Sequence, residues 1–180
     1  VGLKCYKISK KEILFLKKFK PWGIILFSRN IKSIKQVKKL NSHIKKIFSD
    51  KNYPILIDEE GGSVTRLNKI LISSNFTAQY FGRRYHSDKK NFNKYIDIYV
   101  NQISFLLRDL GININNAPIL DIKRKISDII IGNRSFSSNK LIVSKIGKFF
   151  IEKFHENKIA TVMKHIPGHG LAKVDSHKKT

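Results

Sequence analysis

The sequence predicts an α/β protein built around a parallel sheet, and three observations support this fold class. Short apolar runs alternate along the 180 residues with longer stretches in which apolar residues recur at helical spacing. The strand-like runs, such as "GIILF", are apolar at consecutive positions, which is typical of strands covered on both faces. Hydrophobic residues make up 41% of the chain, so one domain with a sizeable core is expected.

The first third of the chain contains two predicted helices and two predicted strands. A capping box formed by Ser9 and Glu12 predicts a short helix over "ILFLKKF". A buried strand is expected at 23–28, and another at 53–58, before a Gly-Gly turn. Between the two strands, apolar residues at helical spacing predict the second helix: Ile34, Val37, Leu40, Ile44 and Ile47.

The rest of the chain continues the alternation. A long amphipathic helix is expected over 88–110, with Gly111 as its stop signal. A strand-like segment follows at 112–122, then a helix at 139–156 and a strand at 159–165. Because strands alternate with helices, the strands are expected to run parallel.

Polar signatures come directly after the predicted strands: "SRN", "DEEGG", "DIKRK" and "KHIPGHG". In parallel α/β folds the carboxyl ends of the strands carry the active site, so these segments are expected to meet there. This pattern separates an eight-stranded barrel poorly from a doubly wound sheet. No G-x-G-x-x-G follows the first strand, which weakens a dinucleotide-binding interpretation.

The segment "KHIPGHGLAKVDSH" contains the most concentrated titratable chemistry. Asp175 could hydrogen-bond one ring nitrogen of His177, fix its tautomer and leave the other nitrogen free for proton transfer. A surface Asp and His in a polar tail is the alternative. A metal site formed by His165, His169, His177 and Asp175 is a third possibility, although the ammonium of Lys164 would oppose a cation.

The run Asp58–Glu60 places three carboxylates at the end of a strand, where they could bind sugar hydroxyls, a metal or only water. Arg66 follows eight residues later, and Arg134 lies in "GNRSF". Each arginine could form an ordinary surface salt bridge. A guanidinium directed into a cleft would instead hold substrate oxygens with paired donors.

The formal charge of +23 raises the possibility of nucleic-acid binding. However, 29 of the 36 basic residues are lysines spread evenly along the chain, and arginine clusters with interleaved aromatics are absent. We therefore expect solvated helix faces and no specific nucleic-acid partner. No apolar run reaches the length of a bilayer span and no export signal is visible, so no membrane partner is expected. The single Cys5 fits a reducing compartment, and a cytoplasmic location is expected.

Five stretches together resemble the bacterial β-N-acetylhexosaminidases of glycoside hydrolase family 3. In order they are "GIILFSRN" (23–30), "IDEEGGSVTR" (57–66), "NNAPILDI" (115–122), "IGNRSF" (131–136) and "KHIPGHGLAKVDSH" (164–177). The resemblance covers essentially the whole chain, and the D-S-H element separates it from the β-glucosidase branch. It implies a (β/α)8 TIM-type barrel, incomplete here, with residues 1–180 supplying about the first five βα units of the N-terminal catalytic domain.

The resemblance also implies roles for individual residues. His177 is the expected general acid/base, paired with Asp175, and His169 has a supporting role. The expected substrate-binding residues are Asp58, Arg66, Arg134, Lys164 and His165. The implied reaction removes terminal β-linked N-acetylglucosamine from peptidoglycan-derived muropeptides with retention of configuration, and it needs no cofactor or metal.

One expected part is missing from these residues. Family members supply the nucleophile as an aspartate well beyond the D-S-H loop, so the chain is interpreted as a partial sequence that is inactive alone. Two alternative functions remain open. The same site could act as a phosphorylase, because a histidine acid/base does not repel phosphate. The chain could also be a catalytically dead sugar-binding protein or a basic nucleic-acid-binding protein.

Overall fold

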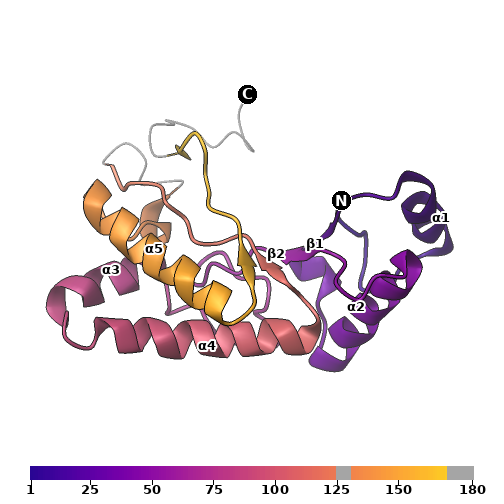
Figure 1. The fold of residues 1–180 in the computed structure, drawn as a ribbon, viewed down its shortest axis with the longest axis horizontal. Helices are drawn as coiled ribbons and strands as arrows, with labels where there is room; N and C mark the ends of the chain where they lie inside the picture. Colours follow the sequence, from indigo (N-terminus) through magenta and orange to yellow (C-terminus); the bar gives the residue numbers. More distant parts are fainter. Residues whose placement is uncertain (125–130, 170–180) are drawn as a thin grey trace.

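The computed structural model describes residues 1–124 and 131–169, which fold around one four-stranded parallel sheet (Figure 1). Its strands are β1 (Ile24–Leu26), β2 (Ile55–Ile57), β3 (Ile114–Asn115) and β4 (Ala160–Thr161). Their spatial order is the same as their order in the sequence, and every neighbouring pair is parallel. A doubly wound sheet reverses its strand order, whereas a barrel wall does not. The topology therefore confirms the barrel-type α/β fold.

Helices pack against this sheet and against each other. The described residues form the α-helices α1 (Lys10–Phe19), α2 (Ile34–Phe48), α3 (Ala78–Ser87), α4 (Phe92–Leu110) and α5 (Lys140–Glu156). Helix α4 is the longest of these and contacts α2, α3 and α5, so it links both ends of the fold (Figure 1). Two short 3₁₀ helices, Ser28–Asn30 and Gly132–Arg134, lie in loops that follow strands β1 and β3.

Local sequence signals explain several helix ends. The predicted capping box is present: the Ser9 hydroxyl accepts from the amide of Glu12 at 3.2 Å, and the Glu12 carboxylate accepts from the amide of Ser9 at 2.9 Å. Helix α4 ends at Gly111, whose φ of 78° lies in the left-handed region that glycine adopts without a steric penalty. The helices expected at 34–47 and 139–156 are confirmed within a residue or so.

The long helix expected over 88–110 is wrong at its start. Helix α4 begins at Phe92, and a separate helix, α3, precedes it and ends at Ser87. The hydroxyl of Thr77 caps α3 by accepting from the amide of Tyr80 at 2.9 Å. Asp88 then separates the two helices, because its carboxylate accepts from the amide of Asn91 at 3.3 Å and so offers the backbone an alternative to helical pairing.

The N-terminal segment occupies the fifth strand position only in part. Gly2 forms an isolated parallel bridge with Ile25, and the carbonyl of Val1 accepts from the amide of Ile25 at 2.8 Å. This segment therefore lies beside β1 without forming a strand of the sheet. About five βα units were expected from the sequence, and the described residues contain four strands and this bridge.

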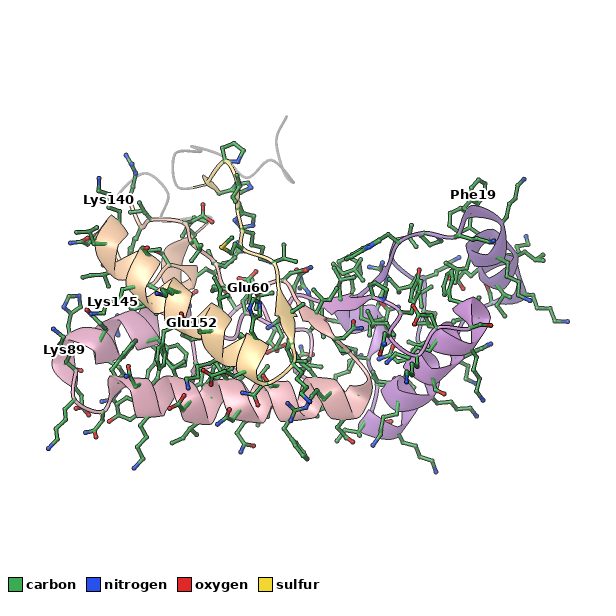
Figure 2. The ribbon with its side chains drawn as sticks, viewed as in Figure 1. Phe19, Glu60, Lys89, Lys140, Lys145 and Glu152 are labelled. Atoms are coloured by element: carbon green, nitrogen blue, oxygen red, sulfur yellow. The ribbon has the colours of Figure 1, made fainter. Side chains whose placement is uncertain are left out.

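The core lies between the sheet and the helices. Ile24, Leu26, Ile55 and Ile57 on the first two strands have no exposed surface. Lysines lie outside this core: Figure 2 shows Lys89 and Lys140 at the periphery and Glu60 inside the fold. Within residues 1–124 and 131–169, no helix combines the length and the apolarity that crossing a membrane would require.

Candidate functional site

The polar segments that follow the strands meet at one edge of the sheet, as the sequence predicts. Asp58 comes directly after β2, Asn116 directly after β3, and Lys164 shortly after β4. An isolated bridge between Ile119 and Lys164 continues the parallel pairing beyond the last strand. Because the strands are parallel, their carboxyl ends lie side by side and bring these side chains together.

Asp58 is the first centre of this cluster. Its carboxylate accepts from Arg66 Nη2 at 3.3 Å, from Lys164 Nζ at 3.1 Å and from Asn116 Nδ2 at 3.1 Å. Burial alone raises the pKa of Asp58, but the Lys164 ammonium and these hydrogen bonds outweigh burial and hold the pKa below its ordinary value. Asp58 is therefore an ionised hydrogen-bond acceptor at neutral pH.

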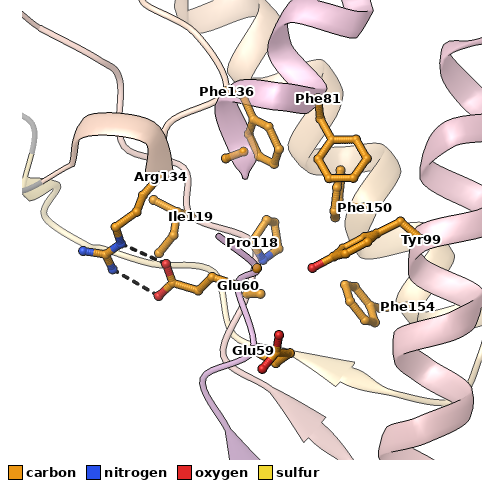
Figure 3. A pocket seen from close by; sticks show the side chains of 13 residues that line it. Glu59, Glu60, Phe81, Tyr99, Pro118, Ile119, Arg134, Phe136, Phe150 and Phe154 are labelled. Carbon is orange, nitrogen blue, oxygen red and sulfur yellow. Dashed lines mark hydrogen bonds and ion pairs between the residues drawn. The ribbon is translucent and has the colours of Figure 1, made fainter. Parts of the chain in front are cut away.

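Glu60 is the second centre. Arg134 donates to it through Nε at 2.9 Å and through Nη2 at 3.0 Å, and Lys164 Nζ lies 2.7 Å from its Oε1 (Figure 3). The Glu60 side chain is only 4% exposed, and those of Arg134 and Lys164 are 18% and 17% exposed. The paired geometry of the guanidinium and the carboxylate fixes both side chains.

The two centres join into one chain of alternating charges, which we call the ion-pair chain: Arg66, Asp58, Lys164, Glu60 and Arg134. It contains three cations and two anions. Four of the predicted substrate-binding residues belong to it, so the structure brings Asp58, Arg66, Arg134 and Lys164 together. The sequence did not identify Glu60 as the residue that links Arg134 to Lys164.

The second carboxylate of the run, Glu59, faces away from the ion-pair chain because side chains alternate along an extended segment. It is buried, and it accepts from the Thr65 hydroxyl at 2.8 Å, from the Ser73 hydroxyl at 2.9 Å and from the backbone amide of Arg66 at 2.9 Å. Burial is the main cause that raises its pKa. Glu59 therefore holds the loop that carries Arg66.

The Gly-Gly turn after this run is needed for close packing. Gly61 has a φ of 79°, and a Cβ at this position would lie 2.3 Å from the carbonyl oxygen of Phe76 and 2.7 Å from the hydroxyl of Tyr99. The next residue, Gly62, has a φ of 65°. Both backbone conformations are rarely adopted by other residues. The turn consequently places the segment after Glu60 against helix α4.

Behind Glu60 lies a small internal cavity of about 20 Å³, which is enough for about one water molecule (Figure 3). Its walls are largely apolar and include five aromatic side chains: Phe81, Tyr99, Phe136, Phe150 and Phe154. The Tyr99 hydroxyl is buried and has no hydrogen-bond partner within residues 1–124 and 131–169. This apolar wall keeps bulk water from the inner side of the Glu60–Arg134 pair, which strengthens the pair.

His165 is held by a different carboxylate. Asp121 Oδ2 lies 2.7 Å from His165 Nδ1 and accepts from the backbone amide of His165 at 3.2 Å. Asp121 Oδ1 accepts from the amide of His169 at 2.5 Å, and the two histidine rings meet edge to face with centroids 4.6 Å apart. Asp121 was not selected from the sequence, although it ends the strand-like segment before "IKRK", where functional side chains are expected.

The predicted acid/base pair, Asp175 and His177, lies outside the described residues, so its geometry stays a prediction. The alternative metal site also stays a prediction, because Asp175 and His177 are two of its four proposed ligands. Among the residues that the structure does describe, no group of three or more His, Cys, Asp or Glu is placed to hold a metal ion.

Comparisons with known proteins agree on one family. The β-hexosaminidase A of Pseudoalteromonas piscicida is 33% identical over 163 residues, which is 86% of this chain and 26% of that protein. The β-hexosaminidase of Xanthomonas euvesicatoria pv. vesicatoria is 28% identical over 177 residues, which is 98% of this chain and 52% of that protein. The chain therefore spans about half or less of the length of these relatives.

Solved structures give the same result. Native NagZ from Neisseria gonorrhoeae superposes with a TM-score of 0.85 at 26% identity, over 98% of this chain and 51% of that one. The same protein has been solved with N-trifluoroacetyl-D-glucosamine and matches with a TM-score of 0.83 at 27% identity, over the same shares of the two chains. Residues 3–180 match the family model of the glycosyl hydrolase family 3 N-terminal domain, and the chain belongs to this family.

Proposed function

We propose that this chain contributes the sugar-binding part of a retaining β-N-acetylhexosaminidase that removes terminal N-acetylglucosamine. The observation that carries the proposal is the ion-pair chain at the carboxyl edge of the sheet, which presents an ionised carboxylate and three cations from separate loops. Sugar hydroxyls both donate and accept hydrogen bonds. Asp58 supplies an acceptor, and Arg66, Lys164 and Arg134 supply donors in fixed positions.

The family supports this choice of sugar. Relatives named β-hexosaminidase match over most of the chain, and a solved relative binds N-trifluoroacetyl-D-glucosamine, an N-acylated glucosamine. The finer proposals are a muropeptide substrate derived from peptidoglycan and a cytoplasmic location. They rest on the resemblance described under Sequence analysis.

In the proposed reaction, His177 protonates the leaving-group oxygen while an aspartate nucleophile attacks the anomeric carbon. Asp175 orients the imidazole. In the second step the same imidazole, now a base, takes a proton from water as the glycosyl–enzyme intermediate is hydrolysed. The nucleophile is not assigned to any residue between 1 and 180. Asp58 is an unsuitable replacement because it already accepts hydrogen bonds from Arg66, Lys164 and Asn116.

The test uses the complete open reading frame that encodes this chain. The His177→Ala variant should hydrolyse N-acetylglucosaminides with poor leaving groups about 10²–10⁴-fold more slowly, because a positioned acid contributes this much. The nitrophenyl substrate should be far less affected, since nitrophenolate leaves without protonation. Affinity for N-acetylglucosamine should stay within about twofold of the wild type, because a proton donor adds little ground-state binding.

Equal losses for good and poor leaving groups would contradict the role of His177 as general acid. A wild-type protein that binds N-acetylglucosamine but releases no sugar would instead indicate a sugar-binding protein. Adding phosphate separates hydrolysis from phosphorolysis, since a phosphorylase would release N-acetylglucosamine 1-phosphate.

A further inference from the structure

We infer that Asp121 is a positioning residue that fixes the imidazole of His165 with its hydrogen on Nδ1, which makes Nε2 a hydrogen-bond acceptor for a ligand hydroxyl. The inference rests on the proposed function in one respect, namely that a sugar binds at this edge of the sheet. It adds Asp121, which was not among the predicted site residues, and it assigns a tautomer to His165, which was.

The geometry of Asp121 carries the first step. Its side chain is fully buried, and both oxygens are engaged by the loop that contains His165 and His169. Both Asp121 oxygens accept from backbone amides, so we assign Oδ2 as the acceptor in the 2.7 Å contact as well, with the hydrogen on His165 Nδ1. In the neutral ring, the lone pair is then on Nε2. The described residues form no hydrogen bond with Nε2.

The loop is built to approach this carboxylate closely. A Cβ at Gly168 would lie 2.9 Å from Asp121 Oδ1, a distance that real Cβ atoms essentially never show. Glycine at this position therefore allows the amide of His169 to reach the same oxygen. The histidine ring and the backbone around it are held by one buried group.

The ion-pair chain offers a ligand few hydrogen-bond acceptors. Arg66, Lys164 and Arg134 can only donate hydrogen bonds, and Asp58 already accepts from three protein groups, which leaves about one of its roughly four acceptor sites for a ligand. A ligand with several hydroxyls needs acceptors for their hydrogens. The His165 side chain is 26% exposed, so Nε2 can supply an acceptor next to Lys164.

An amide at position 121 cannot reproduce this arrangement. Asn has one accepting oxygen and one donating nitrogen, whereas the loop presents the amides of His165 and His169 and the ring Nδ1–H. If the nitrogen replaces Oδ2, it faces the His165 amide and favours the opposite ring tautomer. If it replaces Oδ1, it faces the His169 amide. Asp121→Asn therefore tests the tautomer as well as the loop.

The first experiment measures the tautomer of His165 in the wild-type protein. The complete protein is labelled with ¹⁵N-histidine, and the ring nitrogens of His165 are identified by their loss in His165→Gln. The expected spectrum shows a protonated Nδ1 and a bare Nε2, with Nε2 shifting when N-acetylglucosamine is added. A protonated Nε2, either in the other tautomer or in the imidazolium, would overturn the inference. An Nε2 signal that saturating sugar leaves unchanged would also overturn it.

The second experiment compares Asp121→Asn with Asp109→Asn. Asp109, near the C-terminal end of α4, forms an exposed ion pair with Lys38, so it controls for loss of a carboxylate. Asp121→Asn should lower the affinity for N-acetylglucosamine about tenfold, the usual effect of one lost hydrogen bond, because in either orientation the amide nitrogen faces a backbone amide of the loop. The ring proton should move to Nε2 only where the amide nitrogen replaces Oδ2. Asp109→Asn should change neither. A folded Asp121→Asn variant with the original tautomer and affinity would contradict the inference.

These measurements separate two failures. If wild-type protein does not bind N-acetylglucosamine, the proposed function is wrong. The ligand-free spectrum still decides whether Asp121 sets the tautomer of His165.

Discussion

Replacing Glu60 with Gln should destabilise the protein and disorder the side chains of Arg134 and Lys164, because Glu60 joins these two cations within the ion-pair chain. The wild-type carboxylate receives two hydrogen bonds from Arg134 and an ion pair from Lys164 at 2.7 Å. A glutamine keeps one accepting oxygen, so its amide nitrogen must face at least one of the two cations. Both groups are hydrogen-bond donors, so that contact is lost. Breaking a buried pair from one side typically costs about 3–5 kcal/mol. We expect about 3 kcal/mol here, since Arg134 and Lys164 keep some access to water.

A double-mutant cycle isolates the Glu60–Arg134 interaction. The free energy of unfolding is measured in urea for wild type, Glu60→Gln, Arg134→Met and the double variant of the complete protein. We expect a coupling energy of about 2 kcal/mol, within the range measured for close, desolvated charge pairs. The exposed pair Lys148–Glu152, whose atoms are 3.7 Å apart, provides the matched control. Its coupling should be about 0.5 kcal/mol or less.

The result that would refute this reasoning is a Glu60–Arg134 coupling below about 0.5 kcal/mol, the size of ordinary deviations from additivity. That value would mean that the apolar cavity wall does not strengthen the pair. It would also mean that Arg134 is positioned by other contacts.

Three further predictions concern the neighbourhood of the site and the charge of the chain. Burial raises the pKa of Glu59 above its ordinary value of 4.5. At a pH above 4.5 the unfolded chain therefore loses this proton more readily than the folded protein does. The free energy of unfolding consequently falls as the pH rises. Glu59→Gln should therefore gain stability relative to wild type as the pH rises above 4.5 in urea titrations, and a difference that does not change with pH would contradict this. Gly61→Ala should cost about 2 kcal/mol or more, because strain and a backbone clash add. Gly132→Ala, with a φ of 47° and no atom within 4 Å of the new Cβ, should lose clearly less in the same assay. Binding to a random DNA duplex should be weak at physiological salt and fall steeply with added salt, and tight sequence-dependent binding would favour the nucleic-acid alternative.

Most of the fold could be predicted from local signals. The capping box of Ser9 and Glu12, the glycine stop at Gly111 and the apolar periodicity each depend on residues close in the sequence. Helix α3 was not predicted, and the start of α4 was placed four residues early, because Thr77 and Asp88, which form capping contacts in the structure, look like ordinary polar residues in the sequence. The strands were predicted longer than they are, since apolar runs continue beyond the paired residues.

The site could be predicted in part. Asp58, Arg66, Arg134 and Lys164 come together, but the identity of the linking carboxylate depends on a contact between residues 74 positions apart. Side-chain alternation along 58–60 is the signal that could have separated Glu60, which faces the cations, from Glu59, which faces its own loop. The position of Asp121 near the end of a strand-like segment was the available signal for that residue, but its partners could not be predicted because they lie 44 and 48 positions away in another loop.

The internal pairing of the site has a consequence for ligand binding. Each cation in the ion-pair chain already has a carboxylate partner, so these long side chains are immobilised when the protein folds. Ordering a flexible side chain upon association costs about 0.5–1.5 kcal/mol, and a preorganised site avoids most of this cost. The pairs are also partly buried, which limits screening by salt. A neutral monosaccharide should therefore bind with an affinity that changes little with ionic strength, even though the protein that surrounds it is strongly basic.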